Sequence, residues 1–160
     1  MRALDRYNLM LALLLALLLW LNQQPTQESQ PLLQIDATEV TEIRVTGNRR
    51  LQLSLLRDKE GWTITHPSIE RASEQRTGSL LSLLKAQSYW QRQASPELLG
   101  TYGLKDPKLR ISFNKESIHF GASSVPPGQR YVLVNEVIHL IDDSYFRIAS
   151  LPAKHFRERP

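Results

Sequence analysis

Residues 41–56, TEIRVTGNRRLQLSLL, decide the fold that this sequence predicts. Residues 41–46 alternate apolar and polar side chains, and residues 51–56 do the same, which is the pattern of half-buried β-strands. Between these two segments, Gly47 and Asn48 are residue types that favour a tight turn. The stretch therefore predicts an antiparallel β-hairpin.

The segments that follow this hairpin predict a third strand and then the main helix. Residues 62–65, WTIT, follow a second polar turn and stop at Pro67, so we expect a three-stranded antiparallel meander. Residues 67–87 carry apolar side chains at helical spacing, with Ser68 placed as the N-cap. Gly78 weakens this helix near its middle.

Two shorter helices are expected further along the chain. One begins at Ser95 and is capped by Gly100 or Gly103. The other covers residues 144–150 and is capped by one of the two aspartates that precede it.

The second half of the chain repeats the hairpin theme. Residues 108–114 and 117–121 predict one hairpin, and residues 130–134 and 137–142 predict another. The segment between them, residues 122–129 (ASSVPPGQ), is interpreted as an exposed proline loop that offers a contact surface. The expected fold class is α+β: an N-terminal transmembrane helix, then antiparallel meanders and hairpins with one main helix and short helices between the runs of strands.

Upstream of these elements lies an unbroken apolar run from Leu9 to Leu21. As a helix it would be about 20 Å long, shorter than a bilayer core of about 30 Å, and this length suits a signal peptide. However, residues 22–31 (NQQPTQESQP) lack the paired small residues of a cleavage site, and Tyr7 and Trp20 suit the two membrane interfaces. We therefore expect a retained anchor, with a cleaved signal peptide and a buried core helix as alternatives.

The flanking charges predict how this anchor is oriented. Arg2 and Arg6 precede the apolar run, and no lysine or arginine follows it before Arg44. The positive-inside rule then leaves the N-terminus in the cytoplasm and exports the remainder. The expected location is the bacterial inner (cytoplasmic) membrane, crossed once, with the C-terminal domain in the periplasm.

Four segments follow from these patterns. We expect a signal-anchor transmembrane helix over residues 1–22, a polar linker over 23–34, an exported α+β domain over 35–152, and a basic tail over 153–160.

Composition excludes several classes of function. The chain contains no cysteine, so disulfides, thiolate nucleophiles, cysteine–zinc sites and a lipidated cysteine are all ruled out. The net charge is +4, but the basic residues are scattered, apart from Arg49-Arg50 and the C-terminal tail. Nucleic-acid binders usually cluster their basic residues, so we expect no nucleic-acid partner.

Candidate chemistry is limited to two histidines. His119 and His139 lie in similar settings, IHF and IHL, and would share one side of the sheet if their strands were neighbours. A metal site would need a third ligand such as Asp142 or Glu136. Because each histidine alternates with apolar residues, the solvated face of a strand is the favoured position. We assign no catalytic, cofactor-binding or metal-ligating residue, and expect no cofactor.

The corner between the short helix at Ser95 and the next strand has a clear structural pattern. Gly103 stands where the helix must end, so we expect a positive φ there. Pro107 prevents the helix from continuing, and Tyr102 has a ring to bury at a helix–sheet corner. These patterns favour packing over ligand contact for all three residues.

Residues from Trp62 to Ile141 also carry a family resemblance. Its clearest pieces are Tyr102-Gly103-Leu104 with Pro107, a hairpin ending in Phe120-Gly121, and Arg130-Tyr131-Val132. This set resembles the bacterial domain-of-unknown-function family numbered 4340. The resemblance implies an N-terminal membrane anchor followed by exported strand-rich units, and some relatives are associated with ABC-type transport systems. It implies no active-site residues.

Two classes of function follow from the sequence. The favoured one is a non-enzymatic accessory or interaction subunit of a membrane complex, anchored in the membrane through Leu9 to Leu21 and partnered by a membrane or periplasmic protein. The resemblance adds a transport-related setting. The alternative is a periplasmic enzyme, small-ligand binder or metal binder with a site assembled around His119 and His139.

Overall fold

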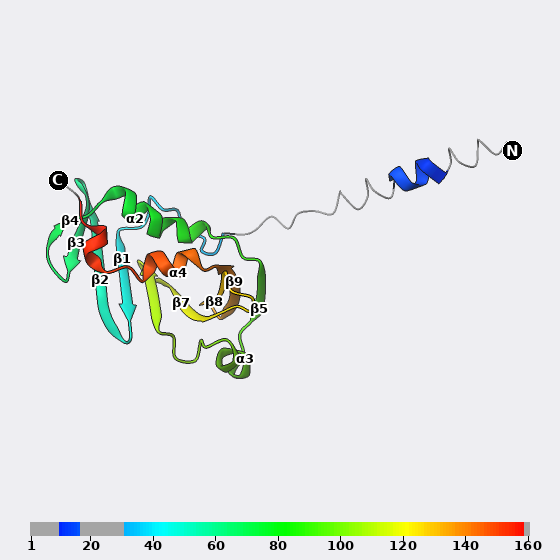
Figure 1. The fold of residues 1–160 in the computed structure, drawn as a ribbon. Helices are drawn as coiled ribbons and strands as arrows, with labels where there is room; N and C mark the ends of the chain where they lie inside the picture. The colour runs from blue at the N-terminus through cyan, green and yellow to red at the C-terminus, as the bar shows by residue number, and fades with distance from the viewer. Residues whose placement is uncertain (1–9, 17–30, 159–160) are drawn as a thin grey trace.

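The computed structural model of the protein describes residues 10–16 and 31–158 (Figure 1). Within these residues the core element is one antiparallel sheet of nine strands, in the order β4-β3-β2-β1-β6-β7-β8-β9-β5. The strands are β1 (Glu42–Gly47), β2 (Arg50–Asp58), β3 (Gly61–His66), β4 (Glu70–Arg71), β5 (Trp90–Gln93), β6 (Leu109–Phe113), β7 (Glu116–Ser123), β8 (Gln129–Val134) and β9 (Val137–Asp142). The α+β class predicted from the sequence is confirmed for this part of the chain.

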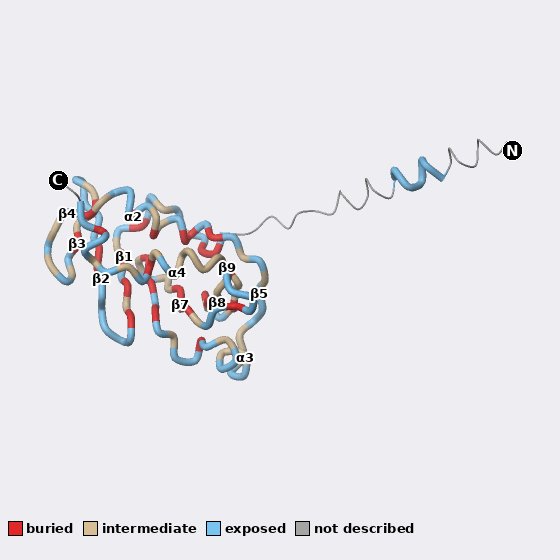
Figure 2. Tube along the Cα trace, viewed as in Figure 1, coloured by how far each residue is buried: buried red, intermediate tan, exposed pale blue. Residues whose placement is uncertain are grey.

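Helices cover one face of this sheet. They are α2 (Glu74–Leu81) with the 3-10 turn η1 (Ser82–Lys85), α4 (Ser144–Ala149) and the 3-10 turn η2 (Ala153–Phe156). Their buried side chains join those of alternate strand positions in one core, which Figure 2 shows as buried stretches on the strands and on the segments above them. This face will be called the helical face.

The sheet has an internal two-fold pattern centred on the β1–β6 pair. Val45 of β1 pairs with Ile111 of β6, and the register runs symmetrically away from this pair in both directions. The hairpin turns obey the same symmetry, because Asn48 donates its N–H to Lys108 O (2.8 Å) and Asn114 donates its N–H to Glu42 O (2.9 Å). Each half is thus a four-stranded meander followed by a helix: β1–β4 with α2, and β6–β9 with α4.

Among the described residues, a helix covers the opposite face of the sheet in its second half only. The short helix α3 (Pro96–Thr101) lies there, away from α2 and α4 (Figure 1). Tyr102, at its C-terminal end, stacks on Tyr131 of β8 with the ring centroids 4.1 Å apart. Leu104 and Ile138 are buried but lie outside the main core cluster, so this face has a small apolar cluster of its own. It will be called the α3 face.

The prediction of the main helix over residues 67–87 is wrong at its start. Ser68 is not the N-cap, because Glu70 and Arg71 form strand β4 against β3. The helix begins at Glu74, after Ser73, whose hydroxyl accepts a hydrogen bond from the N–H of Arg76 (3.4 Å). Pairing with β3 satisfies backbone groups that the predicted first turns would otherwise have used, and this tertiary contact overrides the local helical pattern.

The two short helices are confirmed. Ser95 accepts a hydrogen bond from the N–H of Leu98 (3.3 Å) and begins α3. Gly103 has φ +67°, the left-handed conformation expected where that helix ends. At the start of α4, a carboxylate oxygen of Asp142 accepts a hydrogen bond from the N–H of Ser144 (2.7 Å).

Segments at both ends of the domain pack more closely than their composition suggests. In the predicted linker, Leu32 and Leu33 are buried in the core. In the predicted basic tail, Phe156 is only 1% exposed and Arg157 pairs with Ala72 beside β4.

The predicted anchor lies largely outside the described residues. Residues 10–16 form a helical segment whose large apolar side chains are exposed. Leu9 and residues 17–21, which complete the predicted span, are not among the described residues. Within the described part of the chain, no helix has both the length and the apolar character that crossing a membrane requires.

Candidate functional site

Strand β5 forms one edge of the sheet. Its four residues pair antiparallel with β9, and no other described strand pairs with its second edge. Ala94, directly after β5, donates its N–H to Glu136 O (2.8 Å), so alternate residues bond toward β9. By the same alternation, the backbone groups of Gln91 and Gln93 face outward.

The other edge of the sheet is shielded. Its strand β4 has only two residues, and the C-terminal segment runs beside it. Glu158 donates its N–H to Arg71 O (3.0 Å), and Ala72 forms a bridge with Arg157. Within the described residues, the two edges therefore differ: β4 is short and covered, whereas β5 has free hydrogen-bonding groups.

An aromatic cluster supports β5 on the α3 face. The ring of Trp90 lies edge-on to Tyr102 (5.8 Å between centroids) and to Tyr131 (6.2 Å). Tyr89, next to it in the chain, is half exposed. The cluster ties β5 to β8 and to the end of α3, and so gives the edge strand a fixed position.

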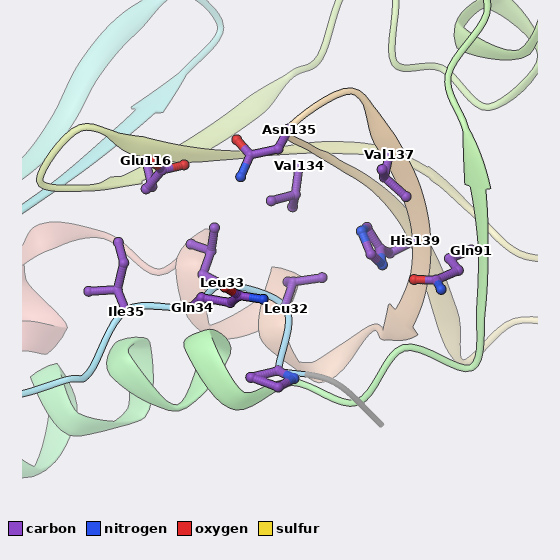
Figure 3. Close-up of a pocket in the computed structure, with 11 residues that line it drawn as sticks. Leu32, Leu33, Gln34, Ile35, Gln91, Glu116, Val134, Asn135, Val137 and His139 are labelled. Carbon is purple, nitrogen blue, oxygen red and sulfur yellow. The ribbon is translucent and has the colours of Figure 1, made fainter. Parts of the chain in front are cut away.

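A pocket of about 430 Å³ lies beside β5 on the helical face (Figure 3). One wall is the segment of residues 31–35, which includes Leu32 and Leu33, and the other is the β8–β9 hairpin. Figure 3 shows side chains from these separate segments converging on the pocket. The polar side chains that line it are Gln34, Gln91, Glu116, Asn135 and His139.

The hydrogen bonds of His139 determine which of its ring nitrogens carries the proton. The Ser88 hydroxyl donates its single hydrogen to Trp90 O (2.9 Å). Ser88 Oγ is also 3.1 Å from His139 Nδ1, so this contact requires Nδ1–H to be the donor. Burial lowers the pKa of His139, which favours the neutral ring. The neutral ring with a proton on Nδ1 leaves Nε2 as a hydrogen-bond acceptor.

The pocket differs in charge from the chain as a whole. The chain carries a net charge of +4, but no lysine or arginine is among the residues that line the pocket. Glu116 is the one carboxylate among them, and within the described residues no basic side chain forms an ion pair with it. The lining therefore combines one carboxylate with neutral side chains that can accept or donate hydrogen bonds.

The structure does not bring His119 and His139 together. Both β7 and β9 pair with β8, where His119 lies opposite Leu133 and His139 lies opposite Val132. Because adjacent strand residues point to opposite faces, His119 is on the α3 face and His139 on the helical face.

The surroundings of the two histidines also differ. His119 Nε2 is 3.2 Å from the Ser117 hydroxyl, and burial, followed by the nearby Arg110, lowers the pKa of His119. Among the described residues, no three histidine or acidic side chains are grouped closely enough to hold a metal ion, and neither Asp142 nor Glu136 provides a shared third ligand.

The residues that carry the family resemblance meet around Gly121, with Tyr102 on the α3 face and Arg130 on the side of α4. The N–H of Ala122 donates to Tyr102 O (2.7 Å), and a Cβ added at Gly121 would lie only 2.3 Å from that oxygen. Arg130 donates to Gly121 O (2.7 Å), pairs with Asp143 (2.6 Å) and lies over the ring of Phe146. These contacts give the residues the structural role predicted for the corner.

Sequence reasoning missed both β5 and the pocket. Strand β5 has the sequence WQRQ, a single large apolar residue followed by polar ones, which has no clear strand pattern. The pocket draws its residues from four segments far apart in the chain, so no local spacing could reveal it. The exposed loop was anticipated: Val125 within ASSVPPGQ is 96% exposed.

Comparisons with known proteins add no relationship. No family model, no curated protein and no solved structure matches the chain. The resemblance to the family numbered 4340 therefore stays a prediction.

Proposed function

We propose that this protein is a membrane-anchored, exported interaction module that binds an extended segment of a membrane or periplasmic partner at the outer edge of β5. It acts as an accessory subunit of a membrane complex and has no enzymatic activity of its own. The transport setting implied by the family resemblance is a proposal of the same kind.

The observation that carries this proposal is the contrast between the two sheet edges. A strand edge with free backbone groups is a template for pairing, and natural proteins usually protect such edges. Here the C-terminal segment shields β4, whereas β5 is supported from behind by Trp90, Tyr102 and Tyr131 and has outward-facing groups at Gln91 and Gln93. Strand addition at such an edge derives affinity from main-chain hydrogen bonds and specificity from alternate side chains.

The apolar run from Leu9 to Leu21 supports the anchored part of the proposal. Tethering the domain to a membrane raises its effective concentration near membrane partners, so a short strand interface suffices for binding. The exposed apolar side chains of residues 10–16 are consistent with a segment that is covered by lipid or protein.

In-cell photo-crosslinking tests the proposal. A photoreactive amino acid replaces Gln93 in the full-length chain, and in a matched control it replaces Gln75, an exposed glutamine of α2. We expect a defined crosslinked partner from position 93 and none from position 75. The absence of a partner at position 93, or the same partner from both positions, would contradict binding at this edge.

A proline variant tests the role of the backbone groups. Gln93→Pro removes an outward N–H and hinders addition of a strand, while the pairing of β5 with β9 is kept. With the photoreactive residue moved to position 91, we expect this variant to lose the crosslinked partner and to retain its melting temperature within a few degrees. An undiminished crosslink in the folded variant would show that contact occurs without strand addition.

A further inference from the structure

We propose that one end of the sheet, where the β1–β2 turn meets the loop between α3 and β6, is a docking surface for an acidic segment of a protein partner. Its basic side chains, all exposed, are Arg49, Arg50, Lys105, Lys108 and Arg110, and this surface will be called the basic end. It is separate from the β5 edge, because β1 and β6 lie in the middle of the strand order.

Two segments that lie far apart in the chain are held together at the basic end. Asn48, in the β1–β2 turn, donates its N–H to Lys108 O in the loop before β6 (2.8 Å). Arg49 of the same turn forms an ion pair with Asp106 of that loop (2.9 Å). Figure 1 shows the turn and the loop side by side. Basic residues that the sequence separates into two groups therefore form one surface.

The charge of this region is almost entirely positive. Residues 43–57 contain no aspartate or glutamate, and residues 98–115 contain only one, Asp106. Asp106 pairs with Arg49, and within the described residues none of the other four basic side chains forms an ion pair. An acidic partner would therefore gain ion pairs here without breaking existing ones, and it would reduce the repulsion between neighbouring cations.

A hollow of about 260 Å³ lies at the basic end on the α3 face. It is lined by Thr46, Arg49, Asp106, Pro107 and Arg110. The hydrogen bond from Arg49 to Asp106 shows that a carboxylate fits in this hollow. Arg110 lies opposite Thr46 in the β1–β6 register and has no acidic partner of its own. A carboxylate of a partner can therefore pair with Arg110 or replace Asp106 on Arg49.

An exposed apolar side chain beside the hollow favours a protein segment over a free anion. Leu51 pairs with Thr46 across the β1–β2 hairpin, so the two side chains share one face of the sheet. Leu51 is 40% exposed. A polypeptide can cover it with an apolar side chain while its carboxylates pair with the basic residues, and an inorganic anion cannot do both.

The position of the basic end favours a partner outside the membrane. Residues 31–35, where the described domain begins, lie beside Glu116 and Asn135. Those two residues are at the β6–β7 and β8–β9 turns, at the opposite end of the strands from the basic end (Figure 1). With the anchor proposed above in the membrane, the basic end points away from the bilayer, so lipid headgroups are a less suitable source of negative charge.

Fluorescence anisotropy with the full-length protein in non-ionic detergent micelles tests this proposal. The probe is a labelled peptide with glutamates on both sides of a leucine, and the control is the same peptide with glutamines. We expect saturable binding of the glutamate peptide that weakens as salt rises from about 50 to about 500 mM, because salt screens exposed charges. No saturable binding at the lower salt concentration, or equal binding of the two peptides, would overturn the proposal.

Matched double variants assign the binding to the basic end. Lys105→Gln combined with Lys108→Gln should weaken binding of the glutamate peptide about three- to tenfold, as for the loss of two exposed ion pairs. The control combines Lys59→Gln with Lys115→Gln, which removes the same charge from exposed turns at the opposite end of the strands and should leave the affinity unchanged. Equal losses in both would mean that overall charge attracts the peptide, and would overturn the assignment.

A gain of affinity separates binding from a structural role. Asp106→Asn removes the carboxylate of the basic end and frees Arg49 for the peptide. Both side chains are largely exposed, at 72% and 81%, so the variant should fold as the wild-type protein does. We expect it to bind the glutamate peptide about threefold more tightly, since an exposed ion pair within the protein no longer competes. Unchanged or weaker binding by the folded variant would contradict the proposal.

Two further probes test the class of partner in the same assay. One is a single-stranded oligonucleotide with the same number of negative charges as the glutamate peptide, and the other is a lipid nanodisc rich in phosphatidylglycerol. We expect both to bind more weakly than the glutamate peptide, and tighter binding of either would overturn the assignment to a protein segment. Gln93→Pro should bind the peptide as the wild-type protein does, so failure of strand addition at β5 and failure of the basic end are distinguishable.

Discussion

The two halves of the domain follow one plan but present different surfaces. In both halves a four-stranded meander leads into a helix, and the hydrogen bonds at Asn48 and Asn114 repeat with the same geometry. The second half alone has α3 on its opposite face and β5 at its edge. The two repeated meanders and their helices form the core. The candidate binding features come instead from β5 and α3, which lie between the two halves in the sequence, and from the strands that they contact.

One pair of equivalent positions makes this difference concrete. Leu55 pairs with Ile43 in the first hairpin, and Phe120 pairs with Leu109 in the second, so Leu56 and Gly121 occupy matching places. Leu56 is 44% exposed because none of the described helices covers the first half on that face. At Gly121, Tyr102 O and Leu104 leave no room for a Cβ.

The largest expected effect is on stability, from truncating one matching core residue in each half, and it tests whether the two halves unfold together. Leu55 and Phe120 are matching core residues, and Leu55→Ala and Phe120→Ala should each lower the free energy of unfolding by about 2–5 kcal/mol. Both should melt the whole domain in one transition, because β1 and β6 join the halves into one sheet. Fluorescence of Trp62 in the first half and of Trp90 in the second, in a Trp20→Phe background, measures this; separate transitions would show independent halves.

The next largest effect compares substitutions at Gly121 and Leu56, the equivalent positions of the two halves on the α3 face. Gly121→Ala should destabilise the domain by about 1–3 kcal/mol, because its Cβ would collide with the backbone at Tyr102. Leu56→Ala at the equivalent exposed position should cost about 1 kcal/mol or less. Chemical denaturation gives both values, and similar costs would mean that α3 does not constrain the second half.

A smaller effect concerns the glycines of the α3 segment. Gly103→Ala should cost about 1 kcal/mol, because Gly103 has a positive φ and Ala122 N lies 3.2 Å from the added Cβ. Gly100→Ala is the control, since nothing lies within 4 Å of its Cβ and a helical alanine is favoured by about 0.5–1 kcal/mol. Thermal unfolding of the two variants should shift in opposite directions; a shared direction would contradict the corner geometry.

The smallest effect is a pH dependence that arises in the second half. Burial lowers the pKa of His139 below 6.5, so below pH 6.5 the unfolded chain binds the proton first and the free energy of unfolding falls as the pH falls. His139→Gln removes this loss. The wild-type protein should therefore lose more stability than the variant between pH 7 and the lowered pKa, as followed by urea denaturation; parallel curves would show that His139 does not contribute.

Local patterns predicted much of the fold, and the exceptions have identifiable causes. Alternating strands, the turns at Asn48 and Asn135, and the Ser95 helix were all predicted because each depends on neighbouring residues. The start of the main helix was predicted wrongly, because β3 pairs with Glu70 and Arg71 and replaces the expected helical turns. The alternative of a shared site around His119 and His139 is not formed, because the register with β8 places these two residues on opposite faces of the sheet.

The sequence by itself determined the class of fold, the corner at Gly103 and the absence of cysteine chemistry, because each is a property of residue type and short-range spacing. Only the tertiary structure decided which sheet edge is free, which histidine faces the pocket and which side chains meet there. Those outcomes depend on strand order and on the parity of the pairing register. A shift of one residue in register moves a side chain to the opposite face, and no local pattern contains that information.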